Sequence, residues 1–341
     1  MELSVNIKKA LRDFILNVNF TIKNEVLALL GASGCGKSMT LKCIAGIQMP
    51  DEGVIILNGR TLFDSDKKIN LRPQERRVGY LFQNYALFPN MTVAENISFV
   101  AVNQNSVEDN IKKFQLNGLE NSYPAQLSGG QQQRVAFARI LSSNAEILLL
   151  DEPFSALDSY LKWQLELEMS KIFQNYDNSA VLVSHDRGEA FRLSNKVAVM
   201  SHGQIEAIDA KHELFKNPKT LSATLLTGCK NVSSARIIDD ENIFADDWQL
   251  SFHIVHCQPF IKYVGFRAKF IEYSQSAGEN TFLFEVVQII EDTFSYLIMV
   301  RAKGSNGKLI RWEVDKKIWR NIQADEIYLH FPSKKLILCN K

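Results

Sequence analysis

A glycine-rich octapeptide near the N-terminus separates a strand-like apolar run, Val26–Leu30, from a run with helical character, 39–45. The glycines allow successive backbone N–H groups to turn inward around phosphate oxygens, and the start of the following helix adds its positive dipole. Within the octapeptide, Lys37 supplies a positive charge and Ser38 a hydroxyl for Mg²⁺. The pattern predicts a nucleotide-phosphate site made by Gly31, Ala32, Ser33, Gly34, Cys35, Gly36, Lys37, Ser38 and Met39.

An acidic pair supplies the second half of such a site. Asp151 and Glu152 directly follow four apolar residues, 147–150, which indicate a buried strand. At the carboxyl end of that strand, Asp151 can reach the coordination shell of Mg²⁺, and Glu152 can polarise an attacking water. A lone Asp-Glu pair is more often a solvated turn, but beside a phosphate loop it predicts nucleotide hydrolysis.

Strand-like apolar runs alternate with helical patterns until about residue 229, where the pattern changes. The alternation is typical of an α/β domain with a mostly parallel sheet between helices. Beyond it, segments with a period of two, such as 282–287 and 295–300, predict a small all-β domain, an antiparallel barrel. The turn 304–307 favours a hairpin between two of these strands. We therefore predict two domains, 1–229 and 230–341.

Length and composition exclude several classes of protein. A chain of 341 residues is longer than one core normally supports, and 46% hydrophobic with 23% charged residues is typical of globular proteins. A net charge of +1 lacks the positive surplus with which proteins bind nucleic acids. No apolar run has membrane-spanning length, the N-terminus lacks a signal-peptide pattern, and the five cysteines form no CxxC pair. We expect a cytoplasmic chain with free thiols and no nucleic-acid partner.

A second glycine-rich helix start indicates the family. The pentapeptide Leu127-Ser128-Gly129-Gly130-Gln131 resembles the signature sequence of ATP-binding-cassette (ABC) ATPases. The family's other motifs follow in the expected order, with Gln83 in 80–84, Asp158 in 155–158 and His185 in 183–186. The resemblance covers about residues 3–215. It implies a P-loop NTPase cassette that carries a small helical subdomain.

The resemblance also implies a division of roles. Two cassettes form a head-to-tail homodimer, and each ATP lies between the phosphate loop of one subunit and the signature of the other, whose helix N-terminus faces the γ-phosphate. The implied nucleotide-binding residues beyond the phosphate loop are Ser128, Gly129, Gly130, Gln131 and Asp158, with Phe14 as the candidate for stacking on adenine. The implied catalytic residues are Glu152, His185 and Gln83. Mg²⁺ is implied to bind Ser38, Gln83 and Asp151.

The spacing of these motifs favours the members of the family that power transport. The interval between Gln83 and Ser128 is too short for the coiled-coil arm of DNA-repair relatives, and a single set of motifs excludes relatives with two fused cassettes. The segment 85–97, together with the residues after it, resembles the helical subdomain that receives a coupling helix from a membrane permease. The resemblance implies a motor subunit at the cytoplasmic face of the membrane, with an extracytoplasmic solute-binding protein as an indirect partner. A soluble cassette regulator without a membrane partner is the alternative.

The C-terminal barrel resembles the OB-like regulatory domain, often called TOBE, of bacterial importer ATPases for sulfate, molybdate, iron and sugars. Residues 263–268 match that family's Val-Gly-x-Arg-Pro turn but lack the proline. In the cassette, residues 57–64 and 69–83 look most like those of molybdate-importer ATPases. We therefore expect import of molybdate or tungstate, with sulfate or thiosulfate, ferric iron, sugar or another solute as alternatives, and a barrel that regulates the ATPase.

Overall fold

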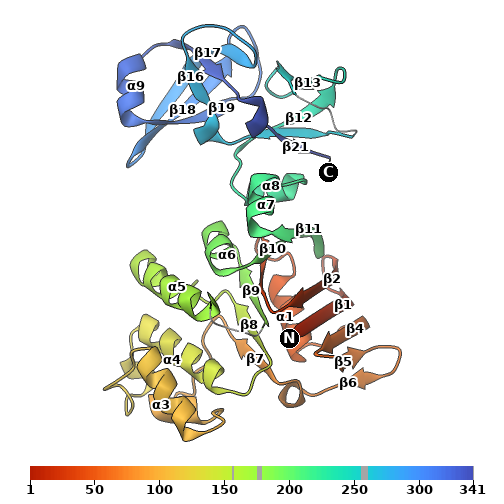
Figure 1. Ribbon diagram of the computed structural model, residues 1–341, viewed down its shortest axis with the longest axis vertical. Coiled ribbons are helices and arrows are strands. Elements are labelled where there is room, and N and C mark those ends of the chain that lie inside the picture. The colour runs from red at the N-terminus through yellow and green to blue at the C-terminus, as the bar shows by residue number, and fades with distance from the viewer. Residues whose placement is uncertain (156, 175–178, 255–259, 341) are drawn as a thin grey trace. The chain divides into compact units, whose positions relative to one another are not determined.

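The computed structural model describes residues 1–155, 157–174, 179–254 and 260–340 (Figure 1). These residues form two compact units, Met1–Lys211 and His212–Lys341. The units divide before the predicted limit at residue 229, because the segment that follows Lys211 bonds to the second unit. Arg267 donates hydrogen bonds to the backbone oxygens of Thr227 and Phe215, at 2.7 and 2.6 Å. The functional division into 1–229 and 230–341 stays a prediction.

The first unit is built on one sheet of eleven strands. Five neighbouring strands run parallel, and the other neighbours pair antiparallel except for one parallel contact between Gln204 and Asn17. Strands β3 (Val26–Gly31), β8 (Ile147–Asp151) and β9 (Ser179–Ser184) are buried along their whole length, as expected for parallel strands covered on both faces. In sheet order the strands are β6 (Ile69–Asn70), β5 (Arg60–Asp64), β4 (Glu52–Leu57), β1 (Glu2–Ala10), β2 (Ile15–Lys23), β11 (Gln204–Ala210), β10 (Lys196–Ser201), β3 (Val26–Gly31), β9 (Ser179–Ser184), β8 (Ile147–Asp151) and β7 (Val78–Leu81).

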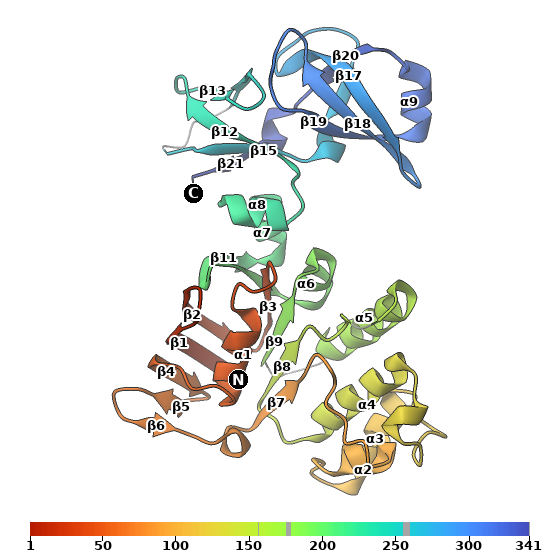
Figure 2. The ribbon, with the colours of Figure 1, turned by 180° about the vertical axis from the view of Figure 1, so that it is seen from behind.

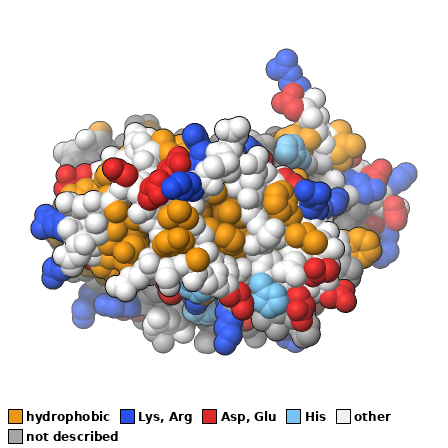
Figure 3. Space-filling model, turned by 90° about the horizontal axis from the view of Figure 1, so that it is seen from above, with side chains coloured by type: hydrophobic (Ala, Val, Ile, Leu, Met, Phe, Trp, Pro, Cys, Tyr) orange, Lys and Arg blue, Asp and Glu red, His pale blue; other side chains and the backbone are white. Residues whose placement is uncertain are grey.

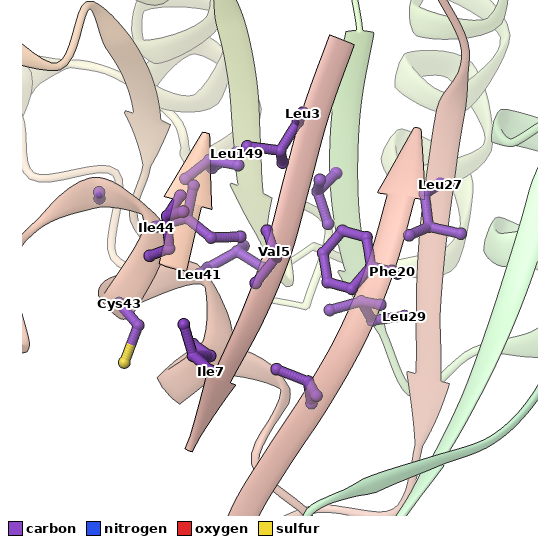
Figure 4. Close-up of a cluster of buried hydrophobic side chains, with 14 of the residues drawn as sticks. Leu3, Val5, Ile7, Phe20, Leu27, Leu29, Leu41, Cys43, Ile44 and Leu149 are labelled. Carbon is purple, nitrogen blue, oxygen red and sulfur yellow. The ribbon is translucent and has the colours of Figure 1, made fainter. Parts of the chain in front are cut away.

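Helices cover both faces of the parallel strands (Figures 1 and 2). They are α1 (Lys37–Ala45), α2 (Val93–Ser98), α3 (Gln104–Lys113), α4 (Gly129–Ser142), α5 (Ser159–Gln174) and α6 (Arg187–Leu193), with short 3₁₀ turns η1 (Pro73–Glu75) and η2 (Pro124–Gln126). On one face, Leu41 and Ile44 of α1 pack with Leu27, Leu149 and residues of β1 and β2 (Figure 4). On the other face, α2 to α5 pack against the alternate residues of the same strands, such as Leu148. Helices α1 and α4 therefore cover opposite faces of the parallel strands.

A fully buried arginine joins the end of α1 to the segment before β7. The Arg76 guanidinium donates to the backbone oxygens of Cys43 and Ile44, both at 2.8 Å, to that of Leu71 at 2.9 Å, and to Oδ1 of Asn70 at 2.8 Å. The first two oxygens belong to the last turn of α1, where carbonyl groups lack the regular helical partner four residues on. The Cys43 oxygen also accepts from the Gly46 N–H, at 3.2 Å. Arg76 thus fixes the C-terminal end of the helix that begins at the phosphate loop.

We predict that Arg76→Met lowers the stability of the first unit by about 3 kcal/mol, since it leaves buried carbonyls without a charged donor. The transition of that unit in calorimetry of the full chain should fall by about 10 °C. Arg77→Met is the matched control, because the Arg77 side chain is 60% exposed and pairs with Glu146 at 3.5 Å. An exposed pair contributes about 0–1 kcal/mol. Equal shifts in both variants would contradict the anchoring role of Arg76.

The second unit is an all-β domain with peripheral helices, which confirms the predicted class. One five-stranded sheet has the order β14 (Leu250–His253), β13 (Asn242–Ala245), β12 (Asn231–Ile237), β15 (Tyr263–Phe266) and β21 (Ile337–Cys339). The other has the order β16 (Glu272–Ser274), β20 (Glu326–His330), β17 (Thr281–Glu291), β18 (Ser295–Ala302) and β19 (Ile310–Asp315). The helical pieces are α7 (Lys211–Lys216), α8 (Leu221–Leu226), α9 (Lys316–Ile322), η3 (Ala268–Phe270) and η4 (Ser333–Lys335).

Aromatic side chains fill the core of this unit. Phe331 lies within 5.0 to 6.1 Å, between ring centroids, of four other phenylalanines. The predicted hairpin is confirmed, because β18 and β19 pair antiparallel on either side of Gly304, whose φ is 74°.

Apolar side chains also reach the molecular surface, as the band across the face in Figure 3 shows. Within the described residues, no helix is both long enough and apolar enough to cross a membrane.

Candidate nucleotide site

The phosphate loop connects the end of β3 to the start of α1, as predicted. Gly34 and Gly36 have φ values of 82° and 107°, which favour glycine. Gly31 is required for a different reason, because a Cβ there would lie 2.5 Å from the backbone oxygen of Met200. Met39, predicted in the same loop, packs partly buried against the core cluster of α1. The nine-residue helix thus starts at a loop whose conformation only glycines allow at these positions.

Lys37 lies buried within this loop. Its ammonium donates to the backbone oxygens of Gly31 and Ala32, at 2.9 and 2.8 Å, and the residue is 4% exposed. These oxygens hold the positive charge at the mouth of the loop, beside the N-terminus of α1. The loop therefore offers inward backbone N–H groups, a helix dipole and one ammonium to an anion.

Asp151 lies at the carboxyl end of β8 and meets the loop directly. Its Oδ1 accepts a hydrogen bond from the Ser38 hydroxyl at 2.6 Å, and its Oδ2 accepts one from the Tyr80 hydroxyl at 2.8 Å. The predicted pair Ser38 and Asp151 is therefore in contact. Two hard oxygen ligands this close match the preference of Mg²⁺, so the residues fit the implied metal. Tyr80 was not predicted as a site residue.

Glu152 lies next to Asp151 in a left-handed conformation, with φ 45°, and its N–H donates to the backbone oxygen of Val183 at 3.1 Å. Its two carboxylate oxygens face different partners. The Gln83 amide nitrogen is 3.5 Å from Oε2, and His185 Nδ1 is 3.4 Å from Oε1. The structure thus brings together the three predicted catalytic residues, which follow the neighbouring strands β7, β8 and β9.

An ion-pair cluster supports the backbone next to His185. Asp186 caps α6 by accepting from the N–H groups of Gly188 and Glu189, at 2.6 and 3.2 Å. The Lys162 ammonium lies 2.7 Å from Asp186 Oδ2 and 2.5 Å from Glu189 Oε1. Burial acts to lower the pKa of Lys162, but its bonds to the two carboxylates outweigh burial and raise it. Lys162 therefore stays charged and holds this turn in place.

The signature residues begin α4. Ser128 Oγ accepts from the Gln131 N–H at 3.3 Å, and Gln131 Oε1 accepts from the Ser128 N–H at 2.8 Å, which is a reciprocal capping box. Ser128 and Gly129 are exposed, and among the described residues a Cβ on Gly129 would meet only Leu157, at 4.0 Å. Helix α4 covers the face of the parallel strands opposite α1, and no hydrogen bond among the described residues joins the signature to the phosphate loop of the same chain.

Two further predicted residues lie near these elements. The Phe14 ring lies beside Gly36 of the phosphate loop and Gly203 of the turn between β10 and β11, since a Cβ on Gly36 would be 3.5 Å from its Cε2 and one on Gly203 would be 2.5 Å from its Cδ2. Asp158 Oδ1 accepts from the N–H groups of Tyr160 and Leu161, at 3.0 and 3.1 Å, and so caps α5. The neighbouring Ala156, part of the same motif, lies outside the described residues. The nucleotide contacts of Phe14 and Asp158 stay predictions.

The fold and the site define the class of P-loop NTPases with an ABC cassette. A family model described as ABC transporter matches residues 15–155. A sulfate/thiosulfate import ATP-binding protein, CysA of Mannheimia succiniciproducens, is 38% identical over 253 residues, 70% of this chain and 69% of that protein. The chain belongs to the ATP-binding proteins of the ABC transporter family.

Other relatives carry different solutes in their names. The spermidine/putrescine import ATP-binding protein PotA of Nitratidesulfovibrio vulgaris is 42% identical over 230 residues, 65% of this chain and 61% of that protein. The Fe(3+) ions import ATP-binding protein FbpC of Haemophilus influenzae is 41% identical over 233 residues, 66% of each chain. The chain thus spans about six tenths of the length of the PotA relative.

Solved structures also resemble the cassette. A dimeric ATP-binding cassette, MJ0796, in a post-hydrolysis state bound to ADP and Pi, has a TM-score of 0.53 and 29% sequence identity. That similarity covers 62% of this chain and 99% of the other. The share of the chain that it covers is close to the extent of the first unit.

Proposed function

We propose that this chain is the ATP-hydrolysing subunit of an ABC import system. The observation that carries the proposal is the meeting of Ser38, Asp151 and Glu152 at the mouth of a phosphate loop, with Gln83 and His185 beside Glu152. Several similar proteins are named import ATP-binding proteins. Phosphoryl transfer requires positioning of the reacting groups and stabilisation of charge, and the residues of this site can supply both.

Each of these residues has its own role in ATP hydrolysis. The loop N–H groups and Lys37 bind the β- and γ-phosphates of ATP. Ser38, Asp151 and Gln83 would hold Mg²⁺, which when bound neutralises charge that develops on the phosphates. Glu152 accepts a proton from the attacking water, and Gln83 and His185 keep its two oxygens oriented toward the γ-phosphate side.

The exposed signature supports a composite site shared by two subunits. We predict that Ser128→Arg leaves nucleotide binding by the isolated subunit within about twofold of the unaltered chain, because Ser128 serves the opposite subunit's nucleotide. Dimerisation with ATP and turnover should both fall, since a long cation replaces the capping hydroxyl at the shared surface. Equilibrium binding of a fluorescent ATP analogue and size analysis measure the two effects separately. Loss of binding by the monomer would show that the signature serves its own subunit.

The helical subdomain presents an apolar surface suited to a permease. Phe88, Phe99 and Val102 are 37%, 61% and 62% exposed, and the first two rings lie 4.8 Å apart. We propose that a coupling helix of the membrane subunit packs here, which would place the chain at the cytoplasmic face of the membrane. Co-purification with a permease tests this proposal. A chain that hydrolyses ATP but never associates with a permease would instead be a soluble regulator.

The proposed solute is molybdate or tungstate, on the resemblance of residues 57–64 and 69–83. Relatives named for polyamine, sulfate and iron import are 42%, 38% and 41% identical, so similarity of this degree does not separate solutes. Sulfate or thiosulfate and ferric iron are the other candidates, and the relatives add spermidine or putrescine. A solute-binding assay on the cognate extracytoplasmic receptor decides among them.

We further propose that the C-terminal unit regulates the ATPase in response to the imported oxyanion. ATPase activity of the whole transporter across a molybdate titration tests this regulation.

A further inference from the structure

Tyr80 contacts the carboxylate that would bind the metal ion. The tyrosine lies on β7, where it pairs in register with Leu149 of β8, two residues before Asp151. A strand advances about 3.3 Å per residue, so the long phenol side chain spans the offset to Asp151. Its hydroxyl reaches Oδ2 at 2.8 Å, while the Ser38 hydroxyl reaches Oδ1 at 2.6 Å. Each oxygen of the carboxylate therefore has its own donor, one from a strand and one from α1.

The direction of this hydrogen bond is fixed by the chemistry of the pair. Burial raises the pKa of the Tyr80 hydroxyl, and the negative charge of Asp151 and the hydrogen bond to it raise that pKa further. The phenol is the donor of the pair, because an ionised carboxylate has no proton to give. The Tyr80 ring is also held from the side, with its centroid 4.5 Å from that of Phe82.

We infer that Tyr80 is a positioning residue for the metal site, whose hydroxyl fixes the plane of the Asp151 carboxylate so that Oδ1 stays beside Ser38. The inference rests on the proposed function, because it assigns a role toward Mg²⁺ that accompanies ATP. Without the phenol, the carboxylate can rotate about its Cβ–Cγ bond and present either oxygen. Mg²⁺ requires near-ideal octahedral geometry, whereas Ca²⁺ accepts irregular coordination. Tyr80 therefore favours Mg²⁺ over the larger cation.

The test is Tyr80→Phe in the full chain, which removes the hydroxyl and keeps the ring. A fluorescent ATP analogue is titrated in EDTA, and then Mg²⁺ or Ca²⁺ is titrated at fixed analogue. We expect unchanged affinity in EDTA, about a tenfold rise in the Mg²⁺ concentration for half-saturation, and less than a threefold change for Ca²⁺. Tyr85→Phe is the control for loss of a buried phenol, since the Tyr85 hydroxyl has no hydrogen-bond partner among the described residues.

Three outcomes would overturn the role of Tyr80. They are an unchanged Mg²⁺ requirement, an equal loss of affinity with and without metal, or an equal effect of the Tyr85 control. The Asp151→Asn background adds a second measurement, because Tyr80→Phe should have no further effect on metal dependence there, and additive effects would contradict the inference. If the unaltered chain itself shows no metal-dependent nucleotide binding, the proposed function fails as well. Normal metal dependence in both the unaltered chain and Tyr80→Phe removes only the role of Tyr80.

Discussion

ATP-bound dimers should accumulate when Glu152 is replaced by glutamine, while hydrolysis falls by about 10²–10⁴-fold, the usual contribution of a general base. Glutamine has the size of glutamate, so Glu152→Gln should preserve the loop and its contact with Gln83. The amide, however, cannot accept the proton of the attacking water. The bound nucleotide then remains intact and continues to join the two subunits. Size analysis in ATP and Mg²⁺, together with single-turnover hydrolysis, measures both effects.

Glu146→Gln is the matched control, because Glu146 directly precedes the same strand, β8, at its other end. Glu146 pairs there with Arg60 and Arg77, at 3.6 and 3.5 Å, and accepts from the Asn58 amide at 2.7 Å. The same chemical change at this end should leave hydrolysis within about twofold, since Glu146 lies at the strand end away from the phosphate loop and its partner Arg77 is 60% exposed. If Glu152→Gln hydrolyses ATP at the unaltered rate, Glu152 is not the base.

Lys37→Ala should weaken nucleotide binding by about 100-fold, since a buried charge-assisted contact contributes about 1.5–3 kcal/mol. In the structure the ammonium is held by the oxygens of Gly31 and Ala32, so it stands ready at the phosphate position. Alanine keeps the helix but leaves the phosphates with N–H groups alone. Equilibrium binding of a fluorescent ATP analogue gives the ratio directly.

Lys42→Ala is the control for Lys37, since Lys42 lies in the last turn of α1. It removes an equal charge from the same helix at the end away from the phosphate loop. Nucleotide affinity of Lys42→Ala should stay within about twofold of the unaltered chain. If the two variants lose affinity equally, the effect belongs to net charge or to helix stability. The thermal midpoints of both variants exclude unfolding as the cause.

The sequence predicts most strongly the features that are encoded by neighbouring residues. The phosphate loop and the start of α4 are short motifs whose glycines and capping groups act within one turn, so their local structure follows from their spacing. The all-β second unit follows from period-two segments. Features that depend on strand register were not predictable in this way. Tyr80 reaches Asp151 only because β7 lies beside β8 with Leu149 opposite Tyr80.

The burial of Arg76 is a second feature that the sequence does not predict. It lies in a polar stretch, 72–77, that by composition indicates a solvated loop, yet it is fully buried. Its burial depends on the carbonyls of α1, which are distant in sequence and bring no charge that a pattern could reveal. The grouping of α7 and α8 with the second unit has the same origin, because the Arg267 bonds to that segment join residues far apart in the chain.

The position of Arg76 has a mechanical consequence. One guanidinium clamps the last turn of α1 to the stretch that leads directly into β7, the strand that carries Tyr80 and runs on toward Gln83. Sliding between the end of α1 and the start of β7 would break these buried hydrogen bonds, so a shift of α1 is transmitted to β7. Beyond Gln83 the backbone turns at Tyr85 and Ala86, whose φ values of 62° and 45° are left-handed. Arg139 of α4 donates to the backbone oxygens of both residues, at 2.8 Å each, so a shift that reaches this bend is passed on to the helical subdomain.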